Sequence, residues 1–177
     1  MVTHTHWDRE WYFSKEEWSF RLIRLFDELL EIIEDEPEYD SFWFDGQTIA
    51  VEDYLELRPE NRERLEQAIK NGKILIGPHY IQVDEHLTGG EAIIRNLETG
   101  FADMKKYGQN TLIGYLPDTF GHISQMPQIF RNFGIDISVF WRGYDNRELK
   151  QLENRWRSPD GSVVDAICLV QGYSCAS

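Results

Sequence analysis

The segment HTHWD near the N-terminus places His4, His6 and Asp8 at alternate positions. In an extended segment, residues two apart point to the same side, so these three side chains could face one space. Imidazole nitrogen and carboxylate oxygen are common protein ligands of divalent metals, Zn2+ among them. The spacing alone fits an N-terminal segment with scattered polar residues equally well, so other parts of the sequence must decide between the two interpretations.

A second concentration of chemically capable residues lies in the segment GYLPDTFGHISQMPQI. Pro117 stiffens the chain before Asp118, and Gly121 permits a tight turn after it. Asp118 could ligate a metal, act as a nucleophile, or do both through its two oxygens. Its structural alternative is to cap the following helix. We expect Asp118 to be functional, whereas His122 fits a supporting loop histidine better than a ligand.

The composition is typical of a soluble globular protein, with 41% hydrophobic and 14% aromatic residues in a chain of 177. The 31 acidic and 18 basic residues give a net charge of −13, which argues against nucleic acid and anionic membranes as partners. Cys168 and Cys175 form no disulfide framework or metal motif, and neither a signal peptide nor a transmembrane segment is evident. We therefore predict a cytoplasmic location. A homo-oligomer of the full-length protein is compatible with the sequence.

The chain alternates between helical and strand-like segments. Apolar residues at spacings of three and four predict a helix over 15–34, with Ser14 and Glu17 as a capping box. Further helices are predicted over 49–57, 59–71, 89–108 and near 125–134, and strands at 41–46, 73–78, 111–117, 136–141 and 162–170, with 80–84 as a strand or an extension. The segment SPDG before the last strand predicts a turn. A buried strand usually has about four to eight apolar residues, and only two, Met1 and Val2, precede the HTHWD segment. We therefore expect the first strand to be shortened.

This alternation predicts parallel βαβ units and hence a single α/β domain over 1–177, with a mainly parallel sheet flanked by helices. In such folds, functional residues gather beyond the carboxyl ends of the strands. Polar residues follow nearly every predicted strand, namely His6, Asp8, Asp45, Asp84, Asp118, His122 and Arg142. The sequence therefore predicts a metal-assisted site at the carboxyl edge of the sheet.

Four segments occur in an order that resembles glycoside hydrolase family 38, above all its bacterial α-mannosidases and mannosylglycerate hydrolases. They are HTHWDREWY, DGQTIAVEDYLELRPE, GPHYIQVDEHLTGGEAIIRNL and GYLPDTFGHISQMPQI. The resemblance implies the N-terminal part of a catalytic domain, with an incomplete seven-stranded β/α barrel of the glycoside hydrolase/deacetylase type. Family members are several times longer, so their downstream domains have no counterpart here. The implied activity is hydrolysis of α-mannosidic bonds by a zinc-dependent retaining mechanism.

The resemblance also implies roles for individual residues. His6, Asp8 and Asp118 match zinc ligands, and Asp118 also matches the nucleophile that attacks the sugar. Arg142 matches an arginine that supports the nucleophile, whereas His4 matches a position that is not a ligand. The fourth zinc ligand and the general acid have no counterpart before Ser177, so we expect this segment alone to be inactive.

The resemblance is less specific about the residues that line the substrate pocket. Asp45 and Asp84 match positions that line the substrate pocket of the family. Aromatic side chains suit stacking against sugar faces, with a place in the core as the alternative for each; the candidates are Trp7, Trp11, Tyr12 and Trp141. Of these, Trp7 is predicted to bind substrate. The implied substrates are mannosides or mannosylglycerate, and a metal that chelates the cis 2- and 3-hydroxyls of mannose could favour the flattened ring of the transition state.

Two other interpretations stay open. HTHWD also looks like the metal motif of amidohydrolase barrels, but those need later lysine or histidine ligands where this chain has PDTFGH. The second alternative is an inactive fragment with weak sugar or metal binding.

Overall fold

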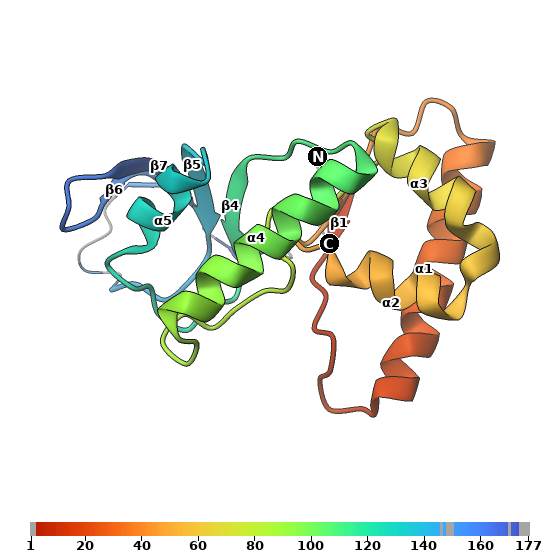
Figure 1. Cartoon of the computed structure of the whole chain (residues 1–177), viewed down its shortest axis with the longest axis horizontal. Coiled ribbons are helices and arrows are strands. Elements are labelled where there is room, and N and C mark those ends of the chain that lie inside the picture. The colour runs from red at the N-terminus through yellow and green to blue at the C-terminus, as the bar shows by residue number, and fades with distance from the viewer. Residues whose placement is uncertain (1–2, 146, 148–150, 170, 174–177) are drawn as a thin grey trace.

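The computed structural model of the chain has a mixed α/β architecture and describes residues 3–145, 147, 151–169 and 171–173 (Figure 1). In chain order the elements are β1 (Thr3–Thr5), α1 (Lys15–Asp35), β2 (Phe42–Phe44), α2 (Ile49–Leu57), the 3-10 helix η1 (Pro59–Asn61), α3 (Arg62–Lys70), β3 (Ile74–Leu75), α4 (Gly90–Tyr107), β4 (Ile113–Leu116), α5 (Met126–Asn132), β5 (Ile137–Phe140), β6 (Glu153–Arg157) and β7 (Val163–Cys168). The predicted α/β class is therefore confirmed.

The strands form two sheets rather than the one sheet that the sequence predicts. The first has the order β1-β2-β3 and is parallel throughout. The second has the order β4-β5-β7-β6, with β4, β5 and β7 parallel and β6 antiparallel to β7. The rings of Trp43 in β2 and Tyr115 in β4 have centroids 5.7 Å apart, so the two sheets contact each other.

Most predicted elements are observed close to their expected bounds. Helix α1 begins after Ser14, whose hydroxyl accepts a hydrogen bond from the Glu17 amide at 3.4 Å. The segment predicted as one helix over 59–71 consists of η1 followed by α3. The first strand, β1, is observed over Thr3–Thr5, whereas Met1, Val2, Val170 and Cys175 lie outside the described residues. The free thiol of Cys168 is buried.

Two segments differ from their predictions. Residues 80–84 form no strand, because the side-chain oxygen of Asn96 in α4 accepts from the Tyr80 and Ile81 amides at 2.7 and 3.2 Å, and its nitrogen donates to the Ile81 carbonyl at 2.6 Å. These bonds take the place of a strand ladder. Conversely, β6 is not predicted, since its sequence ENRWR has no apolar face; it is a sheet edge with alternately exposed side chains. The predicted turn at 158–161 joins β6 to β7.

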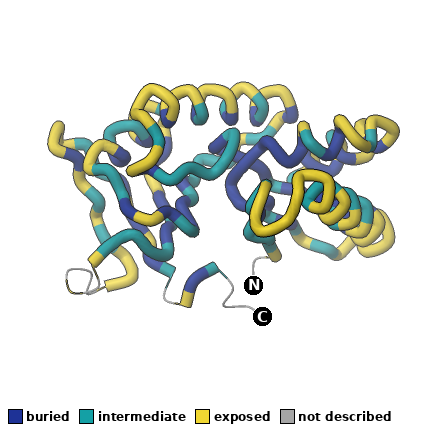
Figure 2. The backbone as a smooth tube through the Cα atoms, turned by 90° about the horizontal axis from the view of Figure 1, so that it is seen from below, coloured by how far each residue is buried: buried dark blue, intermediate teal, exposed yellow. Residues whose placement is uncertain are grey.

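Two apolar clusters form the core. Helices α1, α2 and α3 pack against the first sheet, where Phe26 stacks on Phe44 at 4.9 Å. Helix α5 and part of α4 pack against the second sheet, with Phe130 and Leu97 fully buried. Tyr107 at the end of α4 belongs to the first cluster, so α4 extends over both units (Figure 1). Exposed residues lie mainly along the outer sides of the helices and in loops, and buried residues lie toward the interior (Figure 2).

Helix α4 closely approaches the segment that follows β3 at Gly100. A Cβ atom there would lie 2.1 Å from the Pro78 carbonyl oxygen, so this contact requires glycine. No helix in the described part of the chain is both long and apolar enough to cross a membrane.

Candidate active site

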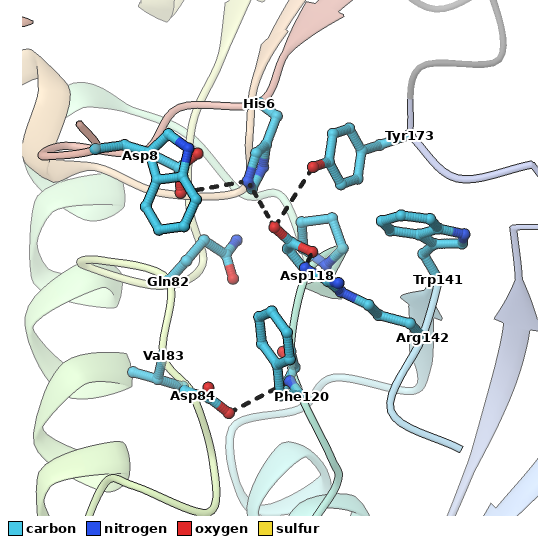
Figure 3. A pocket seen from close by; sticks show the side chains of 13 residues that line it. His6, Asp8, Gln82, Val83, Asp84, Asp118, Phe120, Trp141, Arg142 and Tyr173 are labelled. Carbon is cyan, nitrogen blue, oxygen red and sulfur yellow. Dashed lines mark hydrogen bonds and ion pairs between the residues drawn. The ribbon is translucent and has the colours of Figure 1, made fainter. Parts of the chain in front are cut away.

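A pocket of about 500 Å³ lies where the carboxyl ends of strands from both sheets meet (Figure 3). Its lining residues follow β1, β3, β4, β5 and β7 in the chain, as expected for the carboxyl edge of an α/β fold. They are His6, Asp8, Trp11, Gln82, Val83, Asp84, Pro117, Asp118, Thr119, Phe120, Trp141, Arg142 and Tyr173. The structure thus brings together His6, Asp8, Asp84, Asp118 and Arg142 of the predicted site.

His6 is held from behind by the buried carboxylate of Asp45. One oxygen of Asp45 lies 3.1 Å from Nδ1 of His6. The other accepts hydrogen bonds from the Trp7 amide at 3.1 Å and from Nε2 of Gln47 at 3.0 Å. Asp45 has a φ of 49°, in the left-handed region that aspartate tolerates better than most residues. The carboxylate fixes the proton on Nδ1, so Nε2 of His6 is directed toward the pocket.

Two carboxylates face Nε2 of His6. It lies 3.5 Å from Oδ1 of Asp8 and 3.4 Å from Oδ2 of Asp118. The hydroxyl of Tyr173 donates to the same oxygen of Asp118 at 3.4 Å, and its ring stacks on His6 at a centroid distance of 4.3 Å. Figure 3 shows these four side chains converging on one point of the pocket.

The charges of this cluster are coupled. Burial lowers the pKa of His6, but the nearby carboxylates of Asp45 and Asp8 more than offset this effect and raise the pKa to about 9. Burial raises the pKa of Asp45, while its interactions with His6 act in the opposite direction. The imidazole is the positive partner of the surrounding carboxylates when both of its nitrogens carry a proton, and a metal ion at Nε2 would replace one of these protons.

Arg142 approaches the nucleophile candidate from the opposite side. Its guanidinium forms an ion pair with Oδ1 of Asp118, and it lies over the Phe120 ring at 3.8 Å and the Trp141 ring at 5.0 Å. The two oxygens of Asp118 therefore have different surroundings, one facing the arginine and the other facing His6 and Tyr173. This arrangement fixes the plane of the carboxylate within the pocket.

The donor set can be tested for its fit to zinc. Within the described part of the chain, no three histidine, cysteine, aspartate or glutamate side chains are arranged closely enough to hold a metal ion as they stand. Tetrahedral ligands at about 2.0–2.2 Å from Zn2+ would lie about 3.4 Å apart, which matches the 3.4 and 3.5 Å from Nε2 of His6 to Asp118 and Asp8. That nitrogen is also buried and makes no hydrogen bond to any described residue. The donor types and these two separations fit Zn2+.

Asp84 and His122 are placed differently from each other. Asp84 lines the pocket, and its Oδ1 accepts from the Phe120 amide at 3.3 Å. His122 does not line it; its ring nitrogens lie 2.8 Å from a Glu85 oxygen and 2.8 Å from the Arg142 carbonyl oxygen. The supporting role expected for His122 agrees with this position. His4 does not line the pocket either.

Two predicted substrate-binding residues lie elsewhere than expected. Asp45 has an exposed fraction of 0% and lies behind His6, because the turn after β2 directs its carboxylate inward. Trp7 is 7% exposed and packs against Trp18 and Phe44 at 5.2 and 6.1 Å. Alternate residues of an extended segment point to opposite sides, so a residue between His6 and Asp8 faces the core. Trp7 borders a smaller neighbouring pocket of about 290 Å³.

Several pocket residues are absent from the predicted site. Trp11 is named in the sequence only as an aromatic candidate, although it lies in the same segment as Asp8. Gln82 precedes Asp84 by two positions, the spacing that would place both on one side of an extended segment. Tyr173 follows β7 in a segment without a recognisable motif, and only the fold brings it to His6.

Comparison with known proteins gives consistent matches. The family model for the glycosyl hydrolases family 38 N-terminal domain matches residues 1–177. The chain is 42% identical to a protein of Halalkalibacterium halodurans provisionally named mannosylglycerate hydrolase, and 29% identical to alpha-mannosidase G of Dictyostelium discoideum; the matches cover 98% and 92% of the chain. A crystal structure of an alpha-mannosidase from Enterococcus faecalis V583 matches with a TM-score of 0.94 and 40% identity over 98% of the chain. The chain covers 21%, 15% and 20% of these three proteins.

Proposed function

The chain belongs to glycoside hydrolase family 38, and from this membership and the site geometry we propose that it forms the N-terminal part of the active site of an α-mannosidase-type hydrolase. The observation that carries the proposal is the convergence of His6, Asp8 and Asp118 in one pocket, from loops after β1 and β4. Such a cluster of ligand-type and nucleophilic groups in a concave pocket is typical of a catalytic site.

The proposed substrates are mannosides or mannosylglycerate. Both aromatic rings and polar groups line the pocket, as suits sugar binding, since a pyranose offers apolar faces and hydroxyl edges. Trp11, Phe120 and Trp141 supply rings, and Gln82 and Asp84 supply hydrogen-bonding groups. The net charge of −13 favours neither nucleic acid nor an anionic membrane as a partner, and a cytoplasmic location and a homo-oligomer stay predictions.

We propose Zn2+ as the cofactor, with His6, Asp8 and Asp118 as its ligands in this chain. When bound, the ion would act as a Lewis acid and offer a coordination position to hydroxyl groups of the sugar. Asp45 would support this site indirectly, because its hydrogen bond keeps Nε2 of His6 available as a ligand atom.

Asp118 is the proposed nucleophile of a retaining reaction. Its carboxylate would attack the anomeric carbon while the glycosidic bond breaks and the general acid protonates the leaving oxygen. Water would then hydrolyse the covalent glycosyl-enzyme. Arg142 would orient the attacking carboxylate through the ion pair with Oδ1. We place the general acid and the fourth metal ligand in the part of the longer relatives that this chain does not cover. We likewise propose that the two sheets belong to a seven-stranded barrel, which is completed by the region of the longer relatives that this chain does not cover.

The two alternative interpretations of the sequence, an amidohydrolase and an inactive fragment, differ in their support. The family match leaves the amidohydrolase interpretation without support, since it covers the whole chain. An inactive isolated segment is compatible with the proposal, because the general acid would be lacking.

Covalent trapping tests the proposed function. The longer enzyme that contains this segment is treated with a fluorinated mannosyl inactivator and analysed by peptide mass spectrometry, with Asp118→Asn as the matched variant. We expect the label on the peptide that contains Asp118 and no labelling of the variant. A label on another carboxylate would refute the nucleophile assignment. The 177-residue chain alone should show little or no hydrolysis of aryl α-mannosides, and robust turnover would contradict a missing acid.

A further inference from the structure

Glu85 and His122 form a buried pair next to the pocket but outside its wall. The side chain of Glu85 is 0% exposed and that of His122 is 10% exposed. Oε1 of Glu85 lies 2.8 Å from Nδ1 of His122, and Oε2 accepts a hydrogen bond from the Ile123 amide at 2.7 Å. Both carboxylate oxygens are therefore used by the loop that follows β4.

The second ring nitrogen of His122 reaches the neighbouring loop. Nε2 lies 2.8 Å from the carbonyl oxygen of Arg142, which follows β5. A carbonyl oxygen can only accept, so Nε2 carries a proton. Nδ1 carries one too when the group it faces is the Glu85 carboxylate, because a carboxylate oxygen can only accept. The geometry thus corresponds to a doubly protonated imidazole between two acceptors, and the rings of Phe140 and Trp156 enclose it at 5.3 and 5.1 Å.

The two loops are also packed backbone against backbone. A Cβ atom on Gly143 would lie 2.7 Å from the Gly121 nitrogen and 2.8 Å from the Thr119 oxygen, and Gly143 has a φ of 89°. The contact therefore permits no side chain at Gly143. The hydrogen bond from His122 to the Arg142 carbonyl lies at this contact and sets where the Arg142 backbone stands relative to the β4 loop.

The same arginine carries the ion pair with Asp118. Its carbonyl is held by His122, and its guanidinium pairs with Oδ1 of Asp118. We propose that Glu85 and His122 are positioning residues: an ionised Glu85 keeps His122 doubly protonated, and His122 anchors the Arg142 backbone so that the guanidinium meets the Asp118 carboxylate. The effect on catalysis rests on the proposed function, in which Asp118 is the nucleophile. The protonation state of Glu85 and His122 is independent of that function.

The protonation state can be tested by NMR on the 177-residue chain. Long-range ¹H–¹⁵N correlations of histidine rings are recorded near neutral pH. We expect both nitrogens of His122 to be protonated, and one of them to lose its proton in Glu85→Gln, because an amide NH₂ then donates to Nδ1. His79 is an internal control, since burial lowers its pKa to about 4 and one ring nitrogen should be unprotonated. A singly protonated His122 in the unmodified chain would overturn the proposal.

The positioning role can be tested by kinetics in the longer enzyme. Glu85→Ala removes both carboxylate contacts and should lower kcat on the order of 10- to 100-fold with little change in KM, the scale typical of groups that hold catalytic residues. Glu85→Gln preserves the contacts in neutral form and should restore kcat to within a few-fold of the unmodified enzyme. Glu91→Ala, on the exposed face of α4, is the matched control and should have no effect.

The outcomes separate this proposal from the proposed function. If Asp118→Asn abolishes turnover while Glu85→Ala, folded by circular dichroism, keeps the kcat of the unmodified enzyme, the positioning role is refuted and the nucleophile stands. If Asp118→Asn keeps turnover, the nucleophile assignment fails whatever Glu85 does. If Glu85→Ala does not fold, His122→Ala takes its place, because it removes the hydrogen bond to the Arg142 carbonyl: a kcat lowered roughly 10- to 100-fold with little change in KM supports the proposal, and an unchanged kcat refutes it.

Discussion

Nε2 of His6 lies 3.4 Å from Oδ2 of Asp118, although the two residues follow strands of different sheets. The site therefore exists only if β1 and β4 hold their relative position. The contact between Trp43 and Tyr115 and the span of α4 over both apolar clusters connect the two sheets. Substitutions that loosen this junction should affect the site without touching any of its residues.

The first prediction concerns metal affinity. His6→Ala and Asp8→Ala each remove a proposed ligand atom, so both should weaken Zn2+ binding to the 177-residue chain strongly. Asp45→Asn leaves the ligands in place but weakens the hydrogen bond that orients His6, and it should lower affinity by roughly 10- to 100-fold. Isothermal titration calorimetry with Zn2+ measures the effect. Asp35→Asn, at the exposed end of α1, is the control, and equal affinities for all four variants would contradict the assignment.

The second prediction concerns Asp118 in the longer enzyme. Asp118→Asn retains the shape of the side chain and a neutral oxygen, so the protein should fold and keep part of its metal affinity. The loss of the attacking carboxylate should lower kcat on the order of 10³-fold or more at saturating Zn2+. Asp118→Ala should also lose metal, because it removes the oxygen that faces His6. Parallel rate and zinc-content measurements separate the two effects, and near-normal turnover of Asp118→Asn would reject the assignment.

Much of this arrangement can be predicted from sequence, because it depends on local patterns. Helix α1 follows from the spacing of its apolar residues, and the position of Asp118 follows from the strand and proline before it. The packing of strands into two sheets depends on long-range contacts such as Trp43 with Tyr115, which no local pattern records. The same limit applies to Tyr173, which reaches His6 only through the fold.

Asp45 shows a different limit of sequence reasoning. An aspartate after a strand can line a pocket or support another side chain, and the residue type is the same in both cases. The left-handed backbone of Asp45 selects the supporting position, with the carboxylate behind His6. Trp7, which lies next to Asp45 in space, is different. It stands between His6 and Asp8 in the sequence, so the alternation of side chains along an extended segment already directs it to the core.

The third prediction concerns Gln82. Its Nε2 donates to the Asp45 carbonyl at 2.6 Å, which fixes the orientation of the amide. The opposite oxygen is buried and has no hydrogen-bond partner within the described residues, and the side chain lines the pocket (Figure 3). A buried acceptor without a partner is costly, so a sugar hydroxyl that donates to it should bind favourably. Gln82→Met should therefore raise KM for an aryl α-mannoside by about 10-fold.

The control for Gln82 is Gln125→Met, since Gln125 is exposed and lies outside the pocket. Deoxy-mannosides identify the hydroxyl that is bound, because the unmodified enzyme should discriminate against one of them and Gln82→Met should not. An unchanged KM together with unchanged discrimination would show that Gln82 only supports the Asp45 turn.

The last prediction concerns the pH dependence of stability. His79 is fully buried, its ring nitrogens have no hydrogen-bond partner among the described residues, and its ring packs against Phe130 at 6.1 Å. Burial lowers its pKa from 6.5 to about 4. Between these pH values the unfolded chain binds more protons than the folded chain, so the free energy of unfolding should fall as the pH decreases from about 6.5 toward 4. The total loss from this residue is about 3 kcal/mol.

Urea unfolding of the unmodified chain and of His79→Leu at several pH values isolates this contribution. Other groups titrate in the same range, so the relevant quantity is the difference in unfolding free energy between the two proteins at each pH. Leucine cannot bind a proton, so the difference should shift in favour of His79→Leu as the pH falls from 6.5 to 4, whatever the cost of the substitution at pH 7. A difference that is constant over this range would mean that His79 has the same pKa in the folded and unfolded states, and hence that a hydrogen-bond partner or solvent reaches its ring.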